Sequence, residues 1–251
     1  MKSRIVTLLA SLAIGSSLVF VSAGSTAATS PPAGPSGKGV CATEAAALKP
    51  ASIDTLRAFG DCEINRRFTT LSDLSSRITA SKAMTPSDAS ALQSEISSTR
   101  SGLSGLKATV DAETSMPVLK LDIVRIATDY RVYLLLLPQV NLVNAADAVT
   151  FAQAKFATIN TNLTARIAAA AAAGKDTTAA QADLGAMNAS VAAAVGLASP
   201  LPAQLLPLTP AQYNGGTAGP ILSTARAALG RARDDLKSAI ADAKACRDAL
   251  K

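Results

Sequence analysis

Apolar residues recur at helical spacing along most of the chain. From residue 52 to about residue 82 they lie three or four positions apart, or at multiples of those steps, which predicts an amphipathic helix. The motif "TPSD" then predicts a new helix start, with Thr85 as the N-cap, Pro86 at the first helical position and Asp88 in the first turn. A second apolar stripe ends near Val110, so the two segments predict an antiparallel helical hairpin.

The most apolar run of the chain has a proline at its centre. It is "DYRVYLLLLPQVNLVNAAD", residues 129–147, and helical spacing flanks it on both sides. The stretch 132–143 is too short for a membrane span, and Pro138 disfavours a central strand. We therefore predict one long helix from Pro117 to about residue 173, surrounded by other helices and bent at Pro138.

The rest of the chain predicts two more helices with an irregular segment between them. Gly174 fits a left-handed cap that ends the long helix, and a fourth helix is expected to begin at Asp176 or Thr178. Residues 199–219 contain many prolines and glycines and predict an irregular linker. The last helix is expected from Pro220. It carries an apolar residue at every seventh position: Leu222, Leu229, Leu236, Ala243 and Leu250.

These segments predict an all-α fold. The sequence is rich in alanine and leucine, and only 3% of its residues are aromatic, a composition that favours helices over strands. The expected helix lengths differ, and the third helix is far longer than its partners. We therefore expect an elongated antiparallel bundle of helices one, two, the first half of three, and five. The second half of helix three and helix four would form a protruding hairpin.

The N-terminal residues have the pattern of an export signal. Lys2 and Arg4 precede an apolar run, and small residues follow it, so residues 1–28 predict a cleaved signal peptide. An uncleaved anchor helix is the alternative. Residues 29–51 are rich in Pro, Gly and Ser and predict a disordered linker, and residues 52–251 are expected to form a single helical domain. The expected location is secreted, either extracellular or in the cell envelope.

Three cysteines allow one disulfide and one remaining thiol in an oxidising compartment. The predicted bundle places the end of the last helix beside the start of the first, which brings Cys246 towards Cys62. We therefore favour a Cys62–Cys246 bridge, because closing so long a loop would stabilise the fold. Pairings through Cys41 are the alternatives.

Charge and residue content argue against several functions. Without the signal peptide the formal net charge falls from +6 to +4, and the basic residues are scattered, so we expect no nucleic-acid binding. The sequence contains no histidine, which excludes Ser-His-Asp and Cys-His catalysis and histidine metal sites. Cysteine spacing gives no zinc motif, and no glycine-rich phosphate loop occurs. We therefore expect no enzyme activity, no metal and no cofactor.

One dense polar and aromatic cluster lies in the mature chain, at residues 129–133. Asp129 and Tyr133 are four residues apart, which allows a carboxylate–phenol hydrogen bond along one helix face. A functional interpretation is a ligand pocket beside Pro138. Its predicted lining is Tyr130, Tyr133, Leu134 and Leu137. The alternative is a polar belt whose groups are satisfied by other protein groups, as buried polar groups normally are.

The sequence also resembles a known group of proteins. The stretches "DYRVYLLLLPQVNLVNAAD", "CEINRRFTTLSDLSSRI" and "MTPSD" are similar to segments of secreted, alanine-rich helical proteins from bacteria, which are known mainly as uncharacterised. The resemblance covers the first three helices and weakens afterwards. It implies an exported helical fold and carries no activity.

Two functions from different classes fit the sequence. The first is an exported, non-enzymatic structural or interaction module that presents alanine-rich surfaces to another copy or to an envelope partner. Its expected contact is "RIAAAAAAGK", where an Ala170→Arg change would abolish self-association. The second is a carrier of an apolar small molecule or lipid, held in the pocket beside Pro138. We expect no transmembrane span in the mature chain.

Overall fold

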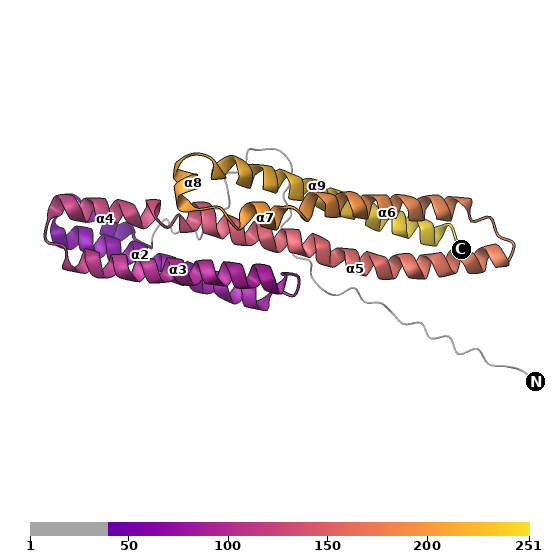
Figure 1. Cartoon of the computed structure of the whole chain (residues 1–251), viewed down its shortest axis with the longest axis horizontal. Coiled ribbons are helices and arrows are strands. Elements are labelled where there is room, and N and C mark those ends of the chain that lie inside the picture. Colours follow the sequence, from indigo (N-terminus) through magenta and orange to yellow (C-terminus); the bar gives the residue numbers. More distant parts are fainter. Residues whose placement is uncertain (1–39) are drawn as a thin grey trace, which may run out of the picture. The chain divides into compact units, whose positions relative to one another are not determined.

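The protein is all-α in the part that the structure describes. A computed structural model of the chain describes residues 40–251, which contain helices and no strand (Figure 1). The predicted signal peptide and residues 29–39 of the predicted linker lie outside these residues. The all-α class expected from the sequence is confirmed.

Helix α2 (Ile53–Ala80) begins at a capping box. The Ser52 hydroxyl accepts a hydrogen bond from the Thr55 backbone N–H, and the Thr55 hydroxyl accepts one from the Ser52 N–H. Together these bonds satisfy two backbone donors that a helix start leaves free. The buried face of the helix follows the predicted spacing: Leu56, Gly60, Ile64, Arg67, Thr70, Leu71, Leu74 and Ile78.

Helix α3 (Pro86–Ala112) starts where the "TPSD" motif predicted. The Thr85 hydroxyl accepts from the Asp88 backbone N–H, and Pro86 occupies the first helical position, where its missing N–H costs nothing. The α2–α3 hairpin is antiparallel. Arg57, near the start of α2, donates from Nε to the Val110 carbonyl at the end of α3, over 3.3 Å.

The expected continuous third helix is interrupted. Helix α4 (Met116–Thr128) ends before Arg131, whose backbone is left-handed, with φ 44° and ψ 35°. A five-residue π-helical turn, η1 (Val132–Leu136), follows and leads into α5 (Leu137–Ala172). Pro138 therefore lies in the first turn of a new helix. The predicted bend at Pro138 within one helix was wrong because the chain breaks upstream, at residues 129–131.

The turn after α5 has the expected glycine. Gly174 has φ 76°, and the Lys175 N–H donates back to the Ala170 carbonyl, so the last carbonyls of α5 find partners. Helix α6 (Thr178–Ala198) then returns along α5, and the two helices are in extensive contact.

The proline-rich segment between α6 and the last helix is more ordered than the sequence suggested. It forms two short helices, α7 (Leu201–Leu205) and α8 (Pro210–Asn214). Prolines occupy the first turn of each, and Thr209 and Gln212 form a capping box at α8. The predicted irregular linker at 199–219 was therefore wrong for these residues, because prolines that disfavour helix interiors are suited to helix starts.

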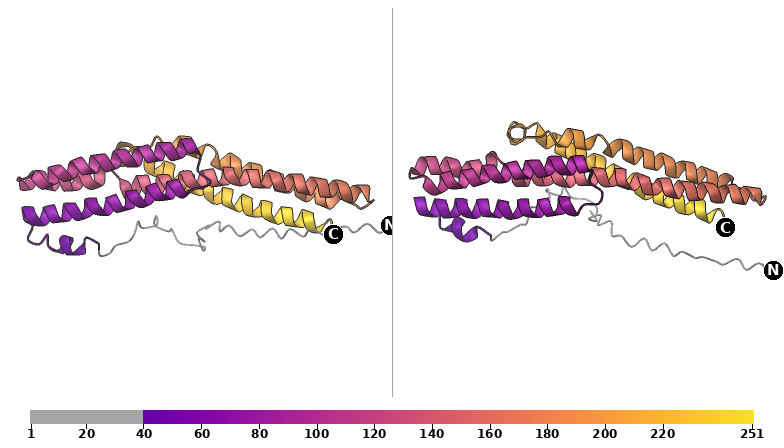
Figure 2. Two further views of the ribbon diagram at one scale, coloured as in Figure 1. Left: turned by 90° about the horizontal axis from the view of Figure 1, so that it is seen from below. Right: turned by 60° about the horizontal axis from the view of Figure 1, so that its bottom comes forward.

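The last helix, α9 (Ala218–Asp248), packs mainly on α6 and α5 (Figures 1 and 2). From the sequence it was expected to pack against the first helix. Helices α2, α3 and α4 instead contact one another, and α5, α6 and α9 do the same. Lys175, at the α5–α6 turn, donates to the backbone carbonyl of Lys251, so the chain end lies at that turn.

The disulfide also differs from the preferred pairing. Cys41 and Cys62 are bonded, with their Cα atoms 5.8 Å apart, and Cys246 is a buried free thiol. A Cys62–Cys246 bridge was wrong because α9 ends beside α5 and α6. A short helix, α1 (Ala42–Ala46), follows Cys41 within the predicted disordered linker. The bridge fixes this helix to α2.

Candidate functional site

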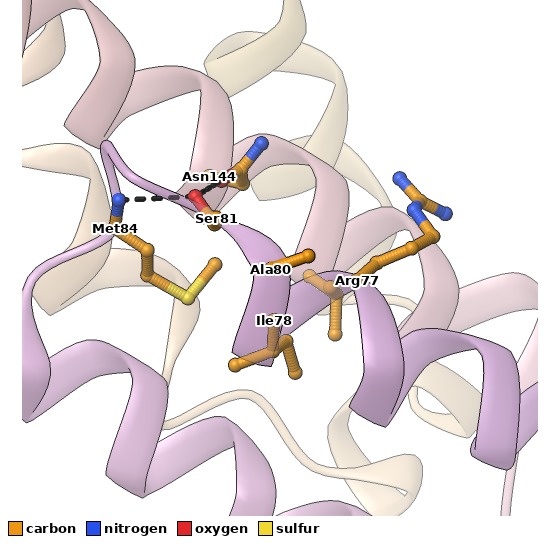
Figure 3. Close-up of a pocket in the computed structure, with 7 residues that line it drawn as sticks. Arg77, Ile78, Ala80, Ser81, Met84 and Asn144 are labelled. Carbon is orange, nitrogen blue, oxygen red and sulfur yellow. Dashed lines mark hydrogen bonds between the residues drawn. The ribbon is translucent and has the colours of Figure 1, made fainter.

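A pocket of about 240 Å³ lies where α2 ends against α5 (Figure 3). Apolar side chains and polar groups from two segments distant in sequence line it. Two of them, Ser81 and Asn144, point towards each other in Figure 3. The lining residues are Arg77, Ile78, Ala80, Ser81, Met84, Val140 and Asn144.

Hydrogen bonds join the end of α2 to α5 around this pocket. The Ser81 hydroxyl donates to Asn144 Oδ1 over 2.6 Å and accepts from the Met84 backbone N–H over 3.1 Å. Arg77 Nη2 donates to Asn141 Oδ1 over 2.5 Å. The two asparagines that follow Pro138 therefore bind the end of α2. This interhelical role explains two amides in an otherwise apolar part of the sequence.

A buried carboxylate stands one helical turn beyond the pocket. Asp147 is 4% exposed, and its Oδ2 accepts from the Thr85 backbone N–H at the N-cap of α3, over 2.9 Å. Burial raises the pKa of Asp147 above its ordinary value of 3.8, the Thr85 N–H opposes that rise, and the neighbouring Asp88 carboxylate adds to it. The pocket is thus adjacent to a carboxyl group that the fold disfavours in its charged form.

The raised pKa of Asp147 makes stability depend on pH. The stabilisation that protonated Asp147 contributes is fully present below pH 3.8, the ordinary pKa of an aspartate. It is lost as the pH rises through the raised pKa that Asp147 has in the folded protein. We expect Asp147→Asn to raise the free energy of unfolding at neutral pH, because an amide oxygen still accepts from Thr85 but carries no charge. The gain should vanish towards pH 3.8. Urea denaturation at a series of pH values measures both effects.

Asp176 provides a matched control for this prediction. It is exposed, and its carboxylate accepts from the Thr178 N–H over 2.9 Å, which lowers its pKa below 3.8. Asp176→Asn should therefore change stability in the opposite direction at neutral pH. If the free energy of unfolding depended on pH in the same way in the wild type and in Asp147→Asn, the buried charge of Asp147 would not destabilise the fold.

The four residues predicted to line a ligand pocket do not line the pocket described above. Tyr130 lies against Gly102 of α3, at van der Waals distance from the glycine. Tyr133 packs beneath two guanidinium groups, those of Arg66 at 4.7 Å and Arg67 at 5.2 Å from its ring centre. Leu134 is exposed. Leu137 is half-buried against the core.

The expected hydrogen bond between Asp129 and Tyr133 is absent, because the helix breaks between them. Asp129 accepts from Arg125 Nε at 3.0 Å and from the Thr128 hydroxyl at 2.9 Å. The Tyr133 hydroxyl instead lies 3.4 Å from the Thr70 hydroxyl of α2. Their contacts are the polar-belt alternative of the sequence analysis, with each group satisfied by other protein groups.

The described residues offer little reactive chemistry. Within residues 40–251 no group of three or more His, Cys, Asp or Glu side chains is placed to hold a metal ion. Burial raises the pKa of the Cys246 thiol, and the nearby Asp183 carboxylate adds to the rise while Arg166 opposes it. A thiol with a raised pKa is a poor nucleophile at neutral pH.

Two helical stretches are long and apolar enough to cross a membrane by length and composition alone. They are residues 116–172, which include the break at Arg131, and residues 178–205. Buried core helices pass the same criterion, and 56% of the first apolar window is buried against the rest of the protein. In the second window the buried share is only 28%. In the second stretch the exposed apolar residues are alanines, whereas its larger apolar side chains are buried or half-buried.

Comparisons with protein-family models, with curated proteins and with solved structures found no match for this chain.

Proposed function

We propose that the chain is an exported, non-enzymatic helical protein that binds another helical surface through the outward face of α6. The observation that carries this proposal is the low burial of the apolar window in residues 178–205, of which 28% is inside the protein. Contiguous exposed apolar surface marks interaction sites on proteins.

The outward face of α6 suits close packing of a second helix. Asp183 is the one charged side chain of the helix. The side facing away from α5 and α9 consists of very small residues, which let two helix backbones approach closely. These exposed residues are Ala182, Gly185, Ala189, Ala192, Ala193 and Gly196. The elongated antiparallel bundle expected from the sequence would present this face along its length.

Export is supported by the disulfide and by the N-terminal sequence. The Cys41–Cys62 bond is consistent with an oxidising compartment, where such bonds form and persist. Residues 1–28 have the pattern of a signal peptide. In this proposal the mature protein acts outside the cytoplasm, either in the envelope or free of the cell. Its partner is another copy of the chain or an envelope protein.

The proposed contact predicts a specific loss of association. Ala189 lies near the centre of the exposed face, so Ala189→Arg places a long charged side chain where a partner helix would pack. We expect the variant to be monomeric where the wild type self-associates, as measured by native, non-reducing mass spectrometry and light scattering. Ala170, which the sequence analysis selected, is half-buried and is a less specific position for this test.

Ala241→Arg is the matched control, because Ala241 is exposed on α9, one helical turn from Lys237 and Lys244. This change should leave the mass unaltered. If the wild-type protein were a monomer with no bound partner under native conditions, self-association through α6 would be contradicted.

A carrier of a small apolar molecule is the second candidate, and the pocket between α2 and α5 favours it. Ile78, Met84 and Val140 supply the apolar surface of this pocket, and the four residues predicted from the sequence do not line it. The same native mass spectra distinguish the two functions. An extra mass that is lost on denaturation supports the carrier, whereas a bare oligomer supports the interaction protein.

A further inference from the structure

The junction between α4 and α5 is strained. Arg131 has φ 44°, the one positive φ at a non-glycine residue within residues 40–251. Left-handed backbone is disfavoured for residues with a Cβ atom, so the surroundings must hold it in place. Such positions concentrate at elements that can switch between two states.

A π-turn lies between Arg131 and Pro138. In a regular helix the Leu134 carbonyl would lack the donor that Pro138 does not have. In the structure the turn is widened, and the Leu137 N–H donates to the Val132 carbonyl five residues back. Isolated π-turns within helices are frequent at functional sites.

Two residues of α8 bind this junction, and we call them the clasp: Tyr213 and Asn214. Asn214 Nδ2 donates to the Thr128 carbonyl over 2.9 Å, and Asn214 Oδ1 accepts from Arg131 Nε over 2.5 Å. The Arg131 guanidinium also stacks 5.3 Å from the centre of the Tyr213 ring. In an uninterrupted helix the Thr128 carbonyl would accept from the Val132 N–H. The clasp therefore replaces a hydrogen bond that the break removes.

A second contact ties the same segment to α5. The Gln139 side chain is 1% exposed, and its Nε2 donates to the Leu205 carbonyl over 2.6 Å and to the Leu206 carbonyl over 3.2 Å. These carbonyls lie at the end of α7, where a helix leaves acceptors free. Residues 201–214 are thus fastened on both sides of the π-turn.

The sequence across the junction also fits one continuous helix. Buried or half-buried residues recur at every seventh position on both sides of the break, and a seven-residue step returns nearly to the same face of a helix. They are Leu119, Ile126, Tyr133, Val140 and Asp147. In one continuous helix these residues would therefore lie on a single face.

We infer that residues 116–172 form a two-state element, broken while the clasp is in place and continuous when it is released. The α7–α8 segment is the strap that selects the broken state. Its release changes how α2, α3 and α4 sit relative to α5, α6 and α9. This switch goes beyond the proposed binding through α6, which requires no movement.

Asn214→Ala in the full-length chain tests the switch, because it removes both clasp hydrogen bonds at an exposed position. Spin labels at Ser94→Cys on α3 and Ser238→Cys on α9 report the distance across the junction. Both positions are exposed, whereas the native cysteines are bridged or buried. We expect a second distance population in the Asn214→Ala variant. We also expect slower hydrogen exchange at Val132, whose N–H gains a helical acceptor.

Arg131→Gly provides the matched rescue, because glycine adopts positive φ without cost and disfavours a helix interior. Adding it to Asn214→Ala should return the distance distribution to that of the wild type. Two results would overturn the inference. One is an unchanged distance distribution in Asn214→Ala. The other is faster exchange across residues 129–136 with no second population, which would show local fraying alone.

Discussion

Replacing Cys62 with serine is expected to lower the free energy of unfolding by about 3 kcal/mol, since the disulfide closes a loop in the unfolded chain. The bonded cysteines are 21 residues apart in sequence, and the loss follows from the greater freedom of the opened loop. Cys41→Ser should have the same effect, because either change removes the one bond. Urea denaturation of the two single variants and of the double variant measures the loss. The double variant should lose no more stability than either single variant.

Cys246 is the control for this prediction. Peptide mapping without reductant should recover Cys41 linked to Cys62 and Cys246 as a free thiol. Cys246→Ala should cost only the small packing loss of one buried sulfur atom, because no covalent bond is broken. Recovery of a peptide that joins Cys62 to Cys246 would contradict the pairing and restore the interpretation made from sequence.

Local signals in the sequence predicted the individual helices well. The Thr85–Pro86 start and the left-handed Gly174 were both confirmed, because each depends on residues within one turn of the site. Apolar spacing likewise predicted the buried face of α2, since half-exposed helices keep a clear stripe.

The arrangement of the helices could not be read from the same signals. An apolar stripe indicates that one face of a helix is buried but not which helix packs against it. The sequence therefore predicted that α9 packs on α2, whereas it packs on α6 and α5. The disulfide prediction failed with it. The break at Arg131 was missed because its contacts include Asn214, which is 83 residues away in sequence. No local motif marks such a contact.

The candidate site shows the same division between local and distant contacts. The pocket joins residues 77–84 with Val140 and Asn144, which lie about 60 residues further along the chain. Tyr130 and Tyr133 were correctly seen as unusual. Their rings, however, are packed against Gly102 and against Arg66 and Arg67, so their role in the described structure is to join helices.

Gly102→Ala is expected to lower the free energy of unfolding by about 1–3 kcal/mol, the usual cost of inserting a methyl group where no space exists. A Cβ at residue 102 would lie 2.6 Å from Cε1 of Tyr130 and 2.9 Å from its hydroxyl oxygen. A rigid aromatic ring cannot bend away, so Tyr130 must move, and it lies directly before the break at Arg131.

Gly105 is three residues further along the same helix, and a Cβ there would have no neighbour within 4 Å. Gly105→Ala should therefore stabilise the protein by about 0.5–1 kcal/mol, because alanine restricts the unfolded chain and favours a helix. In a Tyr130→Ala background, Gly102→Ala should also become stabilising. If Gly102→Ala lowered the free energy of unfolding equally in the Tyr130→Ala background, the clash with the Tyr130 ring would not be the cause of the loss.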